Sequence, residues 1–479
     1  MLLVLGYAIP ALFIMSVALG LAFVCVMQYR LASAVRAEWR LAGVLLVVGV
    51  GALLSIALTT RDLDETKATA ALTYGDLAGG FAASRWLSLF LVVASLVEIA
   101  RGWIEQRRRR LPDPAQAMLV AMLAYYVGTV LIQSIASEQP EFNPRDLYLP
   151  ILLAAIWYQR TVNLEPVIAT ARLVILMLML GSLAGIALAP DFVLHRPEPG
   201  VIPGIDWRLY GLTQHANTIG PVALLGILIE LHAPARWWPL RALALLSSAA
   251  VLVLAQSKTT WGTVPLMLLL VWLPLRLRAS TRVEDAGSFR RAVLALTGVI
   301  VVLVLLACAA AVFDVSGYLD RRIDLATLTG RTKIWDITLH AWRQNVLFGY
   351  GAGIWGPERQ AEFQMFYVGH AHNQVVQTLG ESGLVGLALL LVYLCVLLLT
   401  ALRRFVASRG FVLMLLMLML VQGISEAPMR SEGLLSWSAF LHALLLTMAC
   451  HFVRAPSRGA VVHARSEVDP RHTLVMQPR

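Results

Sequence analysis

Charged residues are scarce in this sequence. Asp, Glu, Lys and Arg make up 14% of the 479 residues, whereas about a quarter of a typical soluble domain is charged. Apolar residues make up 58%, and the mean hydropathy is +0.72. These values exclude a soluble enzyme and a disordered scaffold. They predict an all-α, polytopic integral membrane protein with about 12 transmembrane helices of roughly 20 residues each.

Cysteine and lysine are rare as well. All four cysteines lie in apolar segments, so neither a disulfide framework nor a zinc motif can be built from them. Only three of the 39 basic residues are lysines, and the arginines occur in short runs between apolar segments. Such runs orient membrane spans, so the net charge of +10 does not indicate a nucleic-acid partner. No glycine-rich nucleotide loop appears on the predicted cytoplasmic side, and we expect no nucleotide partner.

Apolar segments recur along the chain. The opening segment carries no charge before Arg30 and is expected to be an uncleaved span, not a signal peptide. Further candidates lie at 41–59, 86–100, 117–136, 147–158, 172–190, 216–232, 242–256, 261–275, 292–313, 383–402, 411–423 and 435–453. The segment at 147–158 is short for a span, so we predict about 12 or 13 spans. They form a transmembrane helical domain over residues 1–453.

Arginine clusters predict how the spans are oriented. By the positive-inside rule the cytoplasmic clusters are Arg30/Arg36/Arg40, Arg107–Arg110, Arg236/Arg241, Arg276–Arg291 and Arg403/Arg404/Arg409. The loops on the other side are then 60–85, 137–146, 191–215, 257–260, 314–382 and 424–434. The polar, basic tail at 454–479 is expected to be disordered in the cytoplasm. Membrane lipids are expected partners of the protein as a whole.

The loop at 314–382 is the longest one, and long loops are usually functional or disordered. Thr332 can cap a helix in which Trp335, Leu339 and Trp342 recur at helical spacing, and the Gly349–Gly351 turn would end it. This pattern fits an amphipathic helix lying at the outer membrane interface. A lid packed on the protein's own core is the alternative.

Four groups of reactive side chains fall on the predicted extracytoplasmic side. They comprise Arg208 with His215 and Asn217; Lys258 in the Gln256–Thr259 turn; Arg331 and Lys333 after Gly330; and His370, His372, Asn373, Gln377 and Glu381. Asn373, Gln377 and Glu381 are spaced by four residues and form one polar stripe on a helix. Such a stripe at the mouth of a span is costly unless it faces protein or a wet cavity. We interpret it as part of a substrate-binding site, with helix–helix hydrogen bonding as the alternative.

The two histidines at 370 and 372 raise the question of a metal. At positions i and i+2 they would point apart on a helix, and no cysteine or nearby cluster of oxygen ligands supplements them. We therefore expect no metal. One functional histidine is better supported, because neutral imidazole can take a proton at ambient pH. His372 is the candidate base and His370 a candidate binding residue; a hydrogen-bonded interface role is the alternative for both.

The basic residues of these groups are candidates for binding a diphosphate. A cation held by glycine and hydroxyl neighbours can do so, Arg through a planar fork and Lys as a point charge. Arg331 and Lys258 fit this description, and Arg208 and Lys333 are secondary candidates. A lipid headgroup contact or a helix anchor is the alternative.

The order of these motifs resembles the O-antigen ligase family, whose superfamily also contains O-antigen polymerases and bacterial protein O-oligosaccharyltransferases. The order runs Arg208-x-x-Gly211…Asn217, Ser257-Lys258-Thr259, Gly330-Arg331-Thr332-x-Ile334-Trp335, Gly349-x-Gly351 and His372-Asn373…Glu381-x-Gly383. Each motif is short, so their order and sidedness carry the resemblance. His-Asn followed by Glu-x-Gly is the most specific piece.

The resemblance implies a glycosyltransferase in the bacterial inner membrane with its active site in the long periplasmic loop. Its donor would be undecaprenyl-diphosphate-linked O-antigen, and its acceptor a sugar hydroxyl of lipid A–core oligosaccharide. His372 would be the essential histidine, Arg331 the loop arginine and Lys258 a second essential cation. That second position is commonly arginine in the family, so Lys258 keeps the charge without the bidentate geometry.

Other functions stay open at this point. A polymerase or a protein glycosyltransferase of the same superfamily would differ only in its acceptor. A lipid-linked sugar transporter should carry charged groups near span midpoints, whereas Glu98 and Glu230 lie near predicted cytoplasmic ends. We expect no cofactor, because the nearest acidic pair, Asp62 and Asp64, lies in a different loop without a phosphate-binding motif.

Overall fold

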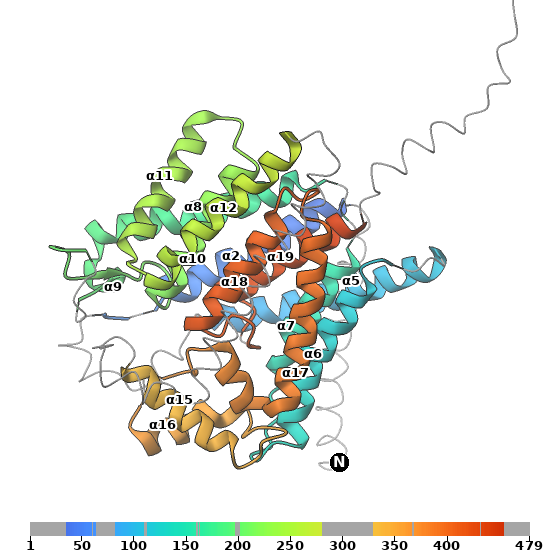
Figure 1. Ribbon diagram of the computed structural model, residues 1–479, viewed down its shortest axis with the longest axis vertical. Coiled ribbons are helices and arrows are strands. Elements are labelled where there is room, and N and C mark those ends of the chain that lie inside the picture. The colour runs from blue at the N-terminus through green and yellow to red at the C-terminus, as the bar shows by residue number, and fades with distance from the viewer. Residues whose placement is uncertain are drawn as a thin grey trace, which may run out of the picture.

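The computed structural model describes residues 35–59, 61–63, 82–109, 113–159, 161, 163–196, 202–279, 329–365, 368–431 and 433–454. Within these ranges the regular elements are helices, apart from one pair of two-residue strands (Figure 1). The predicted opening span, the predicted span at 292–313, the first part of the long loop and the tail after residue 454 lie outside the described residues.

The described helices follow the apolar segments. They are α2 (Ala37–Ala57), α5 (Ala82–Arg109), α6 (Gln116–Ile135), α7 (Tyr148–Tyr158), α8 (Glu165–Leu188), α9 (Pro190–Val193), α10 (Ala216–His232), α11 (Trp238–Leu254), α12 (Lys258–Ala279), α15 (Thr329–Trp342), α16 (Pro357–Phe363), α17 (Gln374–Arg403), α18 (Phe411–Ser425) and α19 (Trp437–Arg454). Two short 3-10 helices are η1 (Pro144–Leu147) and η2 (Ala352–Trp355), and β1 (Leu194–His195) pairs antiparallel with β2 (Arg208–Leu209).

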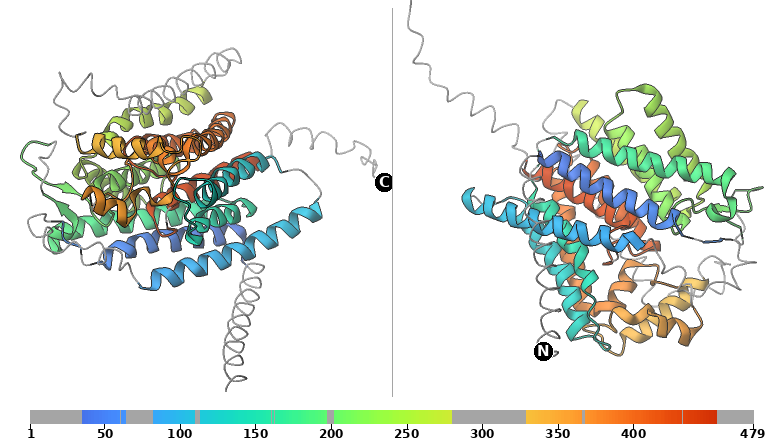
Figure 2. Two further views of the ribbon diagram at one scale, coloured as in Figure 1. Left: turned by 90° about the horizontal axis from the view of Figure 1, so that it is seen from below. Right: turned by 180° about the vertical axis from the view of Figure 1, so that it is seen from behind.

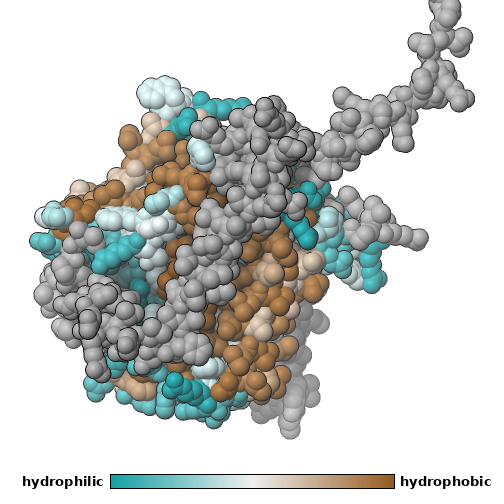
Figure 3. All heavy atoms as spheres, in the orientation of Figure 1, coloured by the Kyte–Doolittle hydropathy of each residue, from teal (hydrophilic) through white to brown (hydrophobic). Residues whose placement is uncertain are grey.

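Five of these helices, α2, α5, α6, α8 and α17, are long and apolar enough to cross a membrane. Helices α10, α11 and α18 are apolar but shorter. The prediction of a helical membrane protein is therefore confirmed, while the number of spans stays a prediction. Figure 3 shows hydrophobic side chains covering the flank formed by α6 and α17, and hydrophilic ones at the lower edge over α15 and α16.

The short apolar segment at 147–158 forms helix α7. Its 11 residues are fewer than the roughly 20 that a bilayer crossing needs. Helix α7 packs against α5, α6 and α19, and Leu152, Leu153 and Trp157 are fully buried. The Trp157 indole N–H also donates to the Ala115 carbonyl at 2.8 Å. The segment is apolar because it lies inside the protein.

The described helices build two hydrophobic cores. In the larger one α2 packs on α8, α10 on α11, and α6 on α17, with α18 and α19 close by (Figure 2). The smaller core lies below it in Figure 1, where α15 and η2 pack on the first half of α17. The boundary between the two cores is where the polar loops meet.

Helix α15 differs from its prediction at both ends. It begins at Thr329, so Thr332 lies inside the first turn and is not the cap, and it ends at Trp342, well before Gly349. Ile334 and Leu339 are buried in the smaller core, so the apolar face packs on the protein itself. Of the two alternatives for this helix, the described residues show the lid packed on the protein's own core.

Helix α17 is kinked at Gly383, whose φ of 62° and ψ of −160° are essentially restricted to glycine. A Cβ there would lie 2.4 Å from the Leu347 carbonyl carbon and oxygen. The amides of Leu384 and Val385, freed by the kink, donate to the carbonyls of Val346 and Leu347 at 3.0 and 3.1 Å. The kink thus joins the segment after α15 to α17 and sets the angle of the first half of α17.

Candidate functional site

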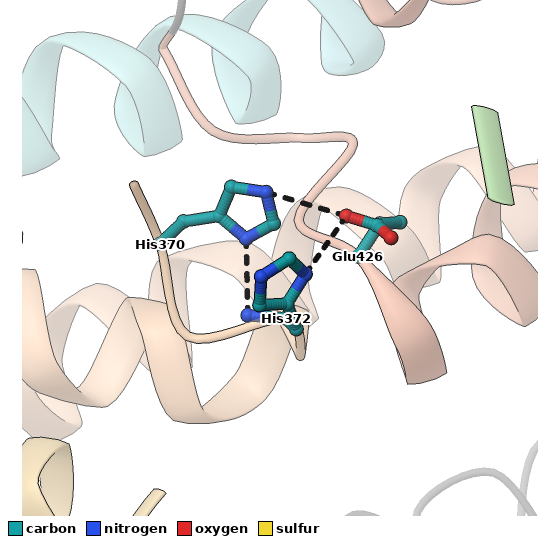
Figure 4. Close-up of side chains that lie close together, drawn as sticks. All are labelled: His370, His372 and Glu426. Atoms are coloured by element: carbon teal, nitrogen blue, oxygen red, sulfur yellow. Dashed lines mark hydrogen bonds and ion pairs between the residues drawn. The ribbon is translucent and has the colours of Figure 1, made fainter. Parts of the chain in front are cut away.

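Glu426 lies at the centre of the candidate site (Figure 4). It follows the last residue of α18 and is 7% exposed. Its Oε2 is 3.3 Å from both His370 Nε2 and His372 Nδ1, and its Oε1 accepts a hydrogen bond from Asn217 Nδ2 at 3.3 Å. Sequence analysis missed this residue, because its partners come from distant segments and no local motif marks it.

The Glu426 carboxylate is ionised. Burial alone would raise its pKa, but hydrogen bonds from His370 and His372, with further electrostatic contributions from His372 and His215, hold the pKa well below its usual value. A buried carboxylate is stable only when donors surround it. The four side chains therefore act as one unit.

The hydrogen bonds assign the tautomer of His370. The backbone N–H of His372 donates to His370 Nδ1 at 3.0 Å, so Nδ1 carries a lone pair and the proton of the neutral ring is on Nε2. That Nε2 proton faces Glu426 Oε2. His370 is therefore a donor to the carboxylate and is not itself free to accept a proton at either nitrogen.

His372 has the opposite arrangement. Its Nδ1 lies against Glu426 Oε2 at 3.3 Å, so Nδ1 donates and Nε2 carries the lone pair. The backbone of His372 is in the left-handed region, with φ of 49°, a strained conformation of the kind that concentrates at functional sites. Burial lowers the pKa of His372, and the charge of Arg331 adds to this lowering, even though Glu426 acts to raise the pKa. The ring is thus neutral at physiological pH.

His215 and Asn217 bring the start of α10 into the site. His215 Nδ1 accepts the Asn217 N–H at 3.0 Å and so caps α10. Burial lowers the His215 pKa to about 4, with the charges of Arg208 and Arg331 acting in the same direction and Glu426 opposing them. The Asn217 amide oxygen accepts from Ser257 Oγ at 3.1 Å, while its nitrogen donates to Glu426.

The predicted cations differ in their contacts with the Glu426 cluster and in their exposure. Arg208 at β2 donates to Asn217 Oδ1 and the Ala255 carbonyl at 3.5 and 3.4 Å. Arg331, half-buried in the first turn of α15, is close enough for its charge to lower the pKa values of His215 and His372. Lys258 begins α12 directly after Ser257 with an exposed side chain, and Lys333 is exposed on α15.

The predicted polar stripe of α17 lies next to the loop that carries His370 and His372, called the histidine loop below. Asn373 caps α17 by accepting the N–H groups of Val375 and Val376. Gln377, fully buried, accepts the Ala371 N–H between the two histidines. In the described part of the chain, Asn373 and Gln377 therefore help to position the loop that carries His370 and His372.

Glu381, the third member of the stripe, pairs with Arg430. The Arg430 Nε donates to Glu381 Oε1 at 2.7 Å, and its NH1 donates to the Gly369 carbonyl at 3.0 Å. Arg430 therefore ties α17 to the start of the histidine loop, and sequence analysis did not select it. The pair lies beside Asp146, whose pKa burial and the Glu381 charge raise to about 6 while Arg430 opposes the rise.

Arg61 is a second missed cation. Its guanidinium donates to the carbonyls of Phe192, Gly211 and Thr213 and stacks on the Phe192 ring. It thereby fixes the loop that leads into His215. An isolated arginine after the end of a predicted span gives no sequence signal for this role.

By their spacing the two histidines could share a metal only where the chain is not helical, and the segment that carries them is not helical. The His370 and His372 ring centroids are 4.2 Å apart, and ligand atoms of both residues and Glu426 lie within 4.8 Å of one another. The hydrogen bonds nevertheless oppose metal binding. For Nε2 of His370 to bind a metal, its proton would have to move to Nδ1, and the hydrogen bond that Nδ1 accepts from the His372 N–H would be lost.

Comparison with known protein families identifies the domain that carries most of these groups. The family model described as O-antigen ligase matches residues 242–391. Residues 242–391 of this chain are thus similar to the O-antigen ligase family. The resemblance of the motifs to that family is confirmed. No curated protein matches the chain closely enough to count as a relative.

The matched domain covers α11, α12, α15, α16 and the first part of α17. Lys258, Arg331, His370 and His372 lie inside it, whereas Glu426 lies beyond its end. The part of the site that comes from the matched domain is thus completed by a carboxylate from the C-terminal helices.

Arg430→Gln should destabilise the protein by about 1–3 kcal/mol, because it leaves the largely buried Glu381 carboxylate without its cation. The double variant Glu381→Gln, Arg430→Gln should recover much of that loss. Thermal unfolding of the detergent-solubilised protein measures both. Arg236→Gln, which removes a highly exposed pair with Glu165, is the control and should change little. Equal losses in the single and double variants would contradict the pairing.

Proposed function

We propose that the protein is a glycosyltransferase on the periplasmic face of the bacterial inner membrane. It transfers O-antigen polysaccharide from undecaprenyl diphosphate to a sugar hydroxyl of lipid A–core oligosaccharide. The observation that carries the proposal is the His372–Glu426 pair beside Arg208 and Arg331. A base and fixed cations are the two kinds of group that this transfer needs.

The base is His372. A sugar hydroxyl has a pKa far above 7, so a positioned base assists its attack. Nε2 takes the hydroxyl proton, and the Glu426 carboxylate on Nδ1 holds the ring in orientation and stabilises the imidazolium that forms, as in other carboxylate–histidine pairs. The acceptor oxygen forms a bond to the anomeric carbon while the bond from that carbon to the diphosphate breaks. One displacement inverts the anomeric centre.

The leaving diphosphate takes the electron pair and gains charge as it departs. Arg331 and Arg208, with Lys258 at the exposed edge, supply positive charge that is already in place before reaction, which is the efficient form of electrostatic catalysis. Asn217 and Ser257 link Arg208 to Glu426, so the cationic and basic parts keep a fixed separation.

The decisive test is reconstitution. Purified protein with lipid-linked O-antigen and lipid A–core should yield glycosylated lipid A–core, visible as a ladder on a gel, and deletion of the gene should remove the ladder while lipid-linked polymer accumulates. A product in which the lipid-linked glycan itself lengthens would instead support a polymerase. Glycosylated protein as the product would support a protein O-oligosaccharyltransferase.

His372→Ala should lower the transfer rate about 100-fold or more, because the base is lost, and Glu426→Gln should have a comparable effect. His370→Ala should be much milder. In the wild type the acid limb of the rate–pH profile should lie at lower pH than that of an unperturbed histidine, since burial lowers the pKa of His372. In Glu426→Gln the acid limb should move to still lower pH, because a group that raises this pKa is gone. Equal losses at both histidines would argue against one catalytic histidine.

Arg331→Ala and Lys258→Ala should each lower the rate by about 100-fold if they stabilise the departing diphosphate. Lys258→Arg should be tolerated, because charge matters more than shape at an exposed position. Arg343→Ala, an exposed cation just after α15, serves as the matched control. A wild-type rate in Lys258→Ala would remove that lysine from the site.

The reaction should proceed in excess EDTA at the rate seen with magnesium. The proposed clamp consists of fixed cations, and the His370 tautomer opposes metal binding at the histidine pair. The donor's diphosphate bond supplies the driving force, so no nucleotide is needed. Loss of activity on chelation, restored by magnesium or manganese, would overturn this mechanism.

A further inference from the structure

A polar cavity opens beside the histidine–carboxylate cluster, on a different wall from the cations. It lies between the end of α2, the start of α10, the end of α18 and the start of α19, and His370 and Glu426 form part of its lining. His372, Arg208 and Arg331 do not line it. The cavity therefore reaches Glu426 from the side of His370.

The lining is polar and uncharged apart from Glu426 and the histidine. Two amides (Gln214 and Gln422), hydroxyls such as Thr218 and Ser438, and the indole of Trp437 contribute to it. Among the described residues, neither a lysine nor an arginine lines the cavity. With an ionised carboxylate on its wall and no cation, the cavity is unfavourable for a phosphate or another anion.

One buried donor in this wall has no hydrogen-bond partner among the described residues. The indole nitrogen of Trp437 is buried and unsatisfied, in a residue that is 5% exposed. Gln422, 6% exposed, lines the same cavity. Buried donors are nearly always paired, so an unpaired donor in a cavity wall points to a ligand that supplies an acceptor.

We propose that this cavity binds an uncharged sugar ring next to the His372–Glu426 pair. Amides, hydroxyls and an indole N–H, each able to bond to a ring hydroxyl or ring oxygen, form the donor and acceptor set that a neutral polyol requires. The proposal rests on the proposed function, since it gives the transferred or accepting sugar a place beside the base and apart from the diphosphate cations.

Such a sugar has two possible sources, the glycan of the donor and the core oligosaccharide of the acceptor. Binding can be measured without turnover by saturation-transfer NMR on the full-length protein in lipid nanodiscs. One arm uses O-antigen glycan released from its lipid, and the other uses dephosphorylated core oligosaccharide. Because no lipid-diphosphate donor is present, failure of the transfer reaction would leave this measurement unaffected.

The variants are Trp437→Phe, which removes the indole donor, and Gln214→Ala, which alters an exposed side chain. Each should weaken binding about three- to tenfold, as expected for one neutral hydrogen bond. Gln344→Ala, an exposed glutamine outside the cavity, is the matched control and should bind like the wild type.

Binding in either arm that both cavity variants weaken supports the proposal and identifies the source of the sugar. Three outcomes would overturn it: no binding in either arm, unchanged binding in both cavity variants, or binding restricted to core oligosaccharide that retains its phosphates. Gln214→Ala keeps the test decisive if Trp437→Phe fails to fold.

Discussion

The site depends on one buried negative charge. An ionised carboxylate removed from water is stable only where enough donors replace its hydration. For Glu426 these donors come from the loop before α17 and from the start of α10. Three chain segments that are remote in sequence therefore have to meet at one point, and their meeting places the base, the cations and the polar cavity within reach of one another.

The loop that carries the histidines is held from several directions. Gln377 binds its backbone, Asn373 caps α17 directly after it, Arg430 holds Gly369, and the kink at Gly383 sets the direction of the first part of α17. These contacts allow His372 to keep a left-handed backbone conformation that would otherwise relax. The polar stripe of α17 thus helps to set the geometry of the proposed base.

Glu426 also separates two chemically different environments. On the side of His372 lie Arg208 and Arg331, suited to a diphosphate. On the side of His370 lies a cavity with amide and hydroxyl groups and, among the described residues, no lysine or arginine; it is suited to a neutral sugar. This division suits the proposed transfer between two lipid-linked substrates, in which the leaving group is highly charged and the sugars are not.

The sequence by itself determined the membrane class, most of the apolar helices and the identity of many polar groups in the site. These properties follow from composition and from short motifs, such as the His-Asn pair before α17, whose meaning is local. The helices at the short 147–158 segment and at α15 were placed less well, since burial inside the protein and membrane insertion leave the same apolar pattern.

Only the tertiary structure revealed Glu426 and Arg430. Glu426 is 54 residues from His372 and 209 from Asn217 in the chain, and a carboxylate at that distance has no spacing rule to mark it. Its role arises from packing, because the low-polarity interior between the helices makes its charge depend on partners that only the fold brings together.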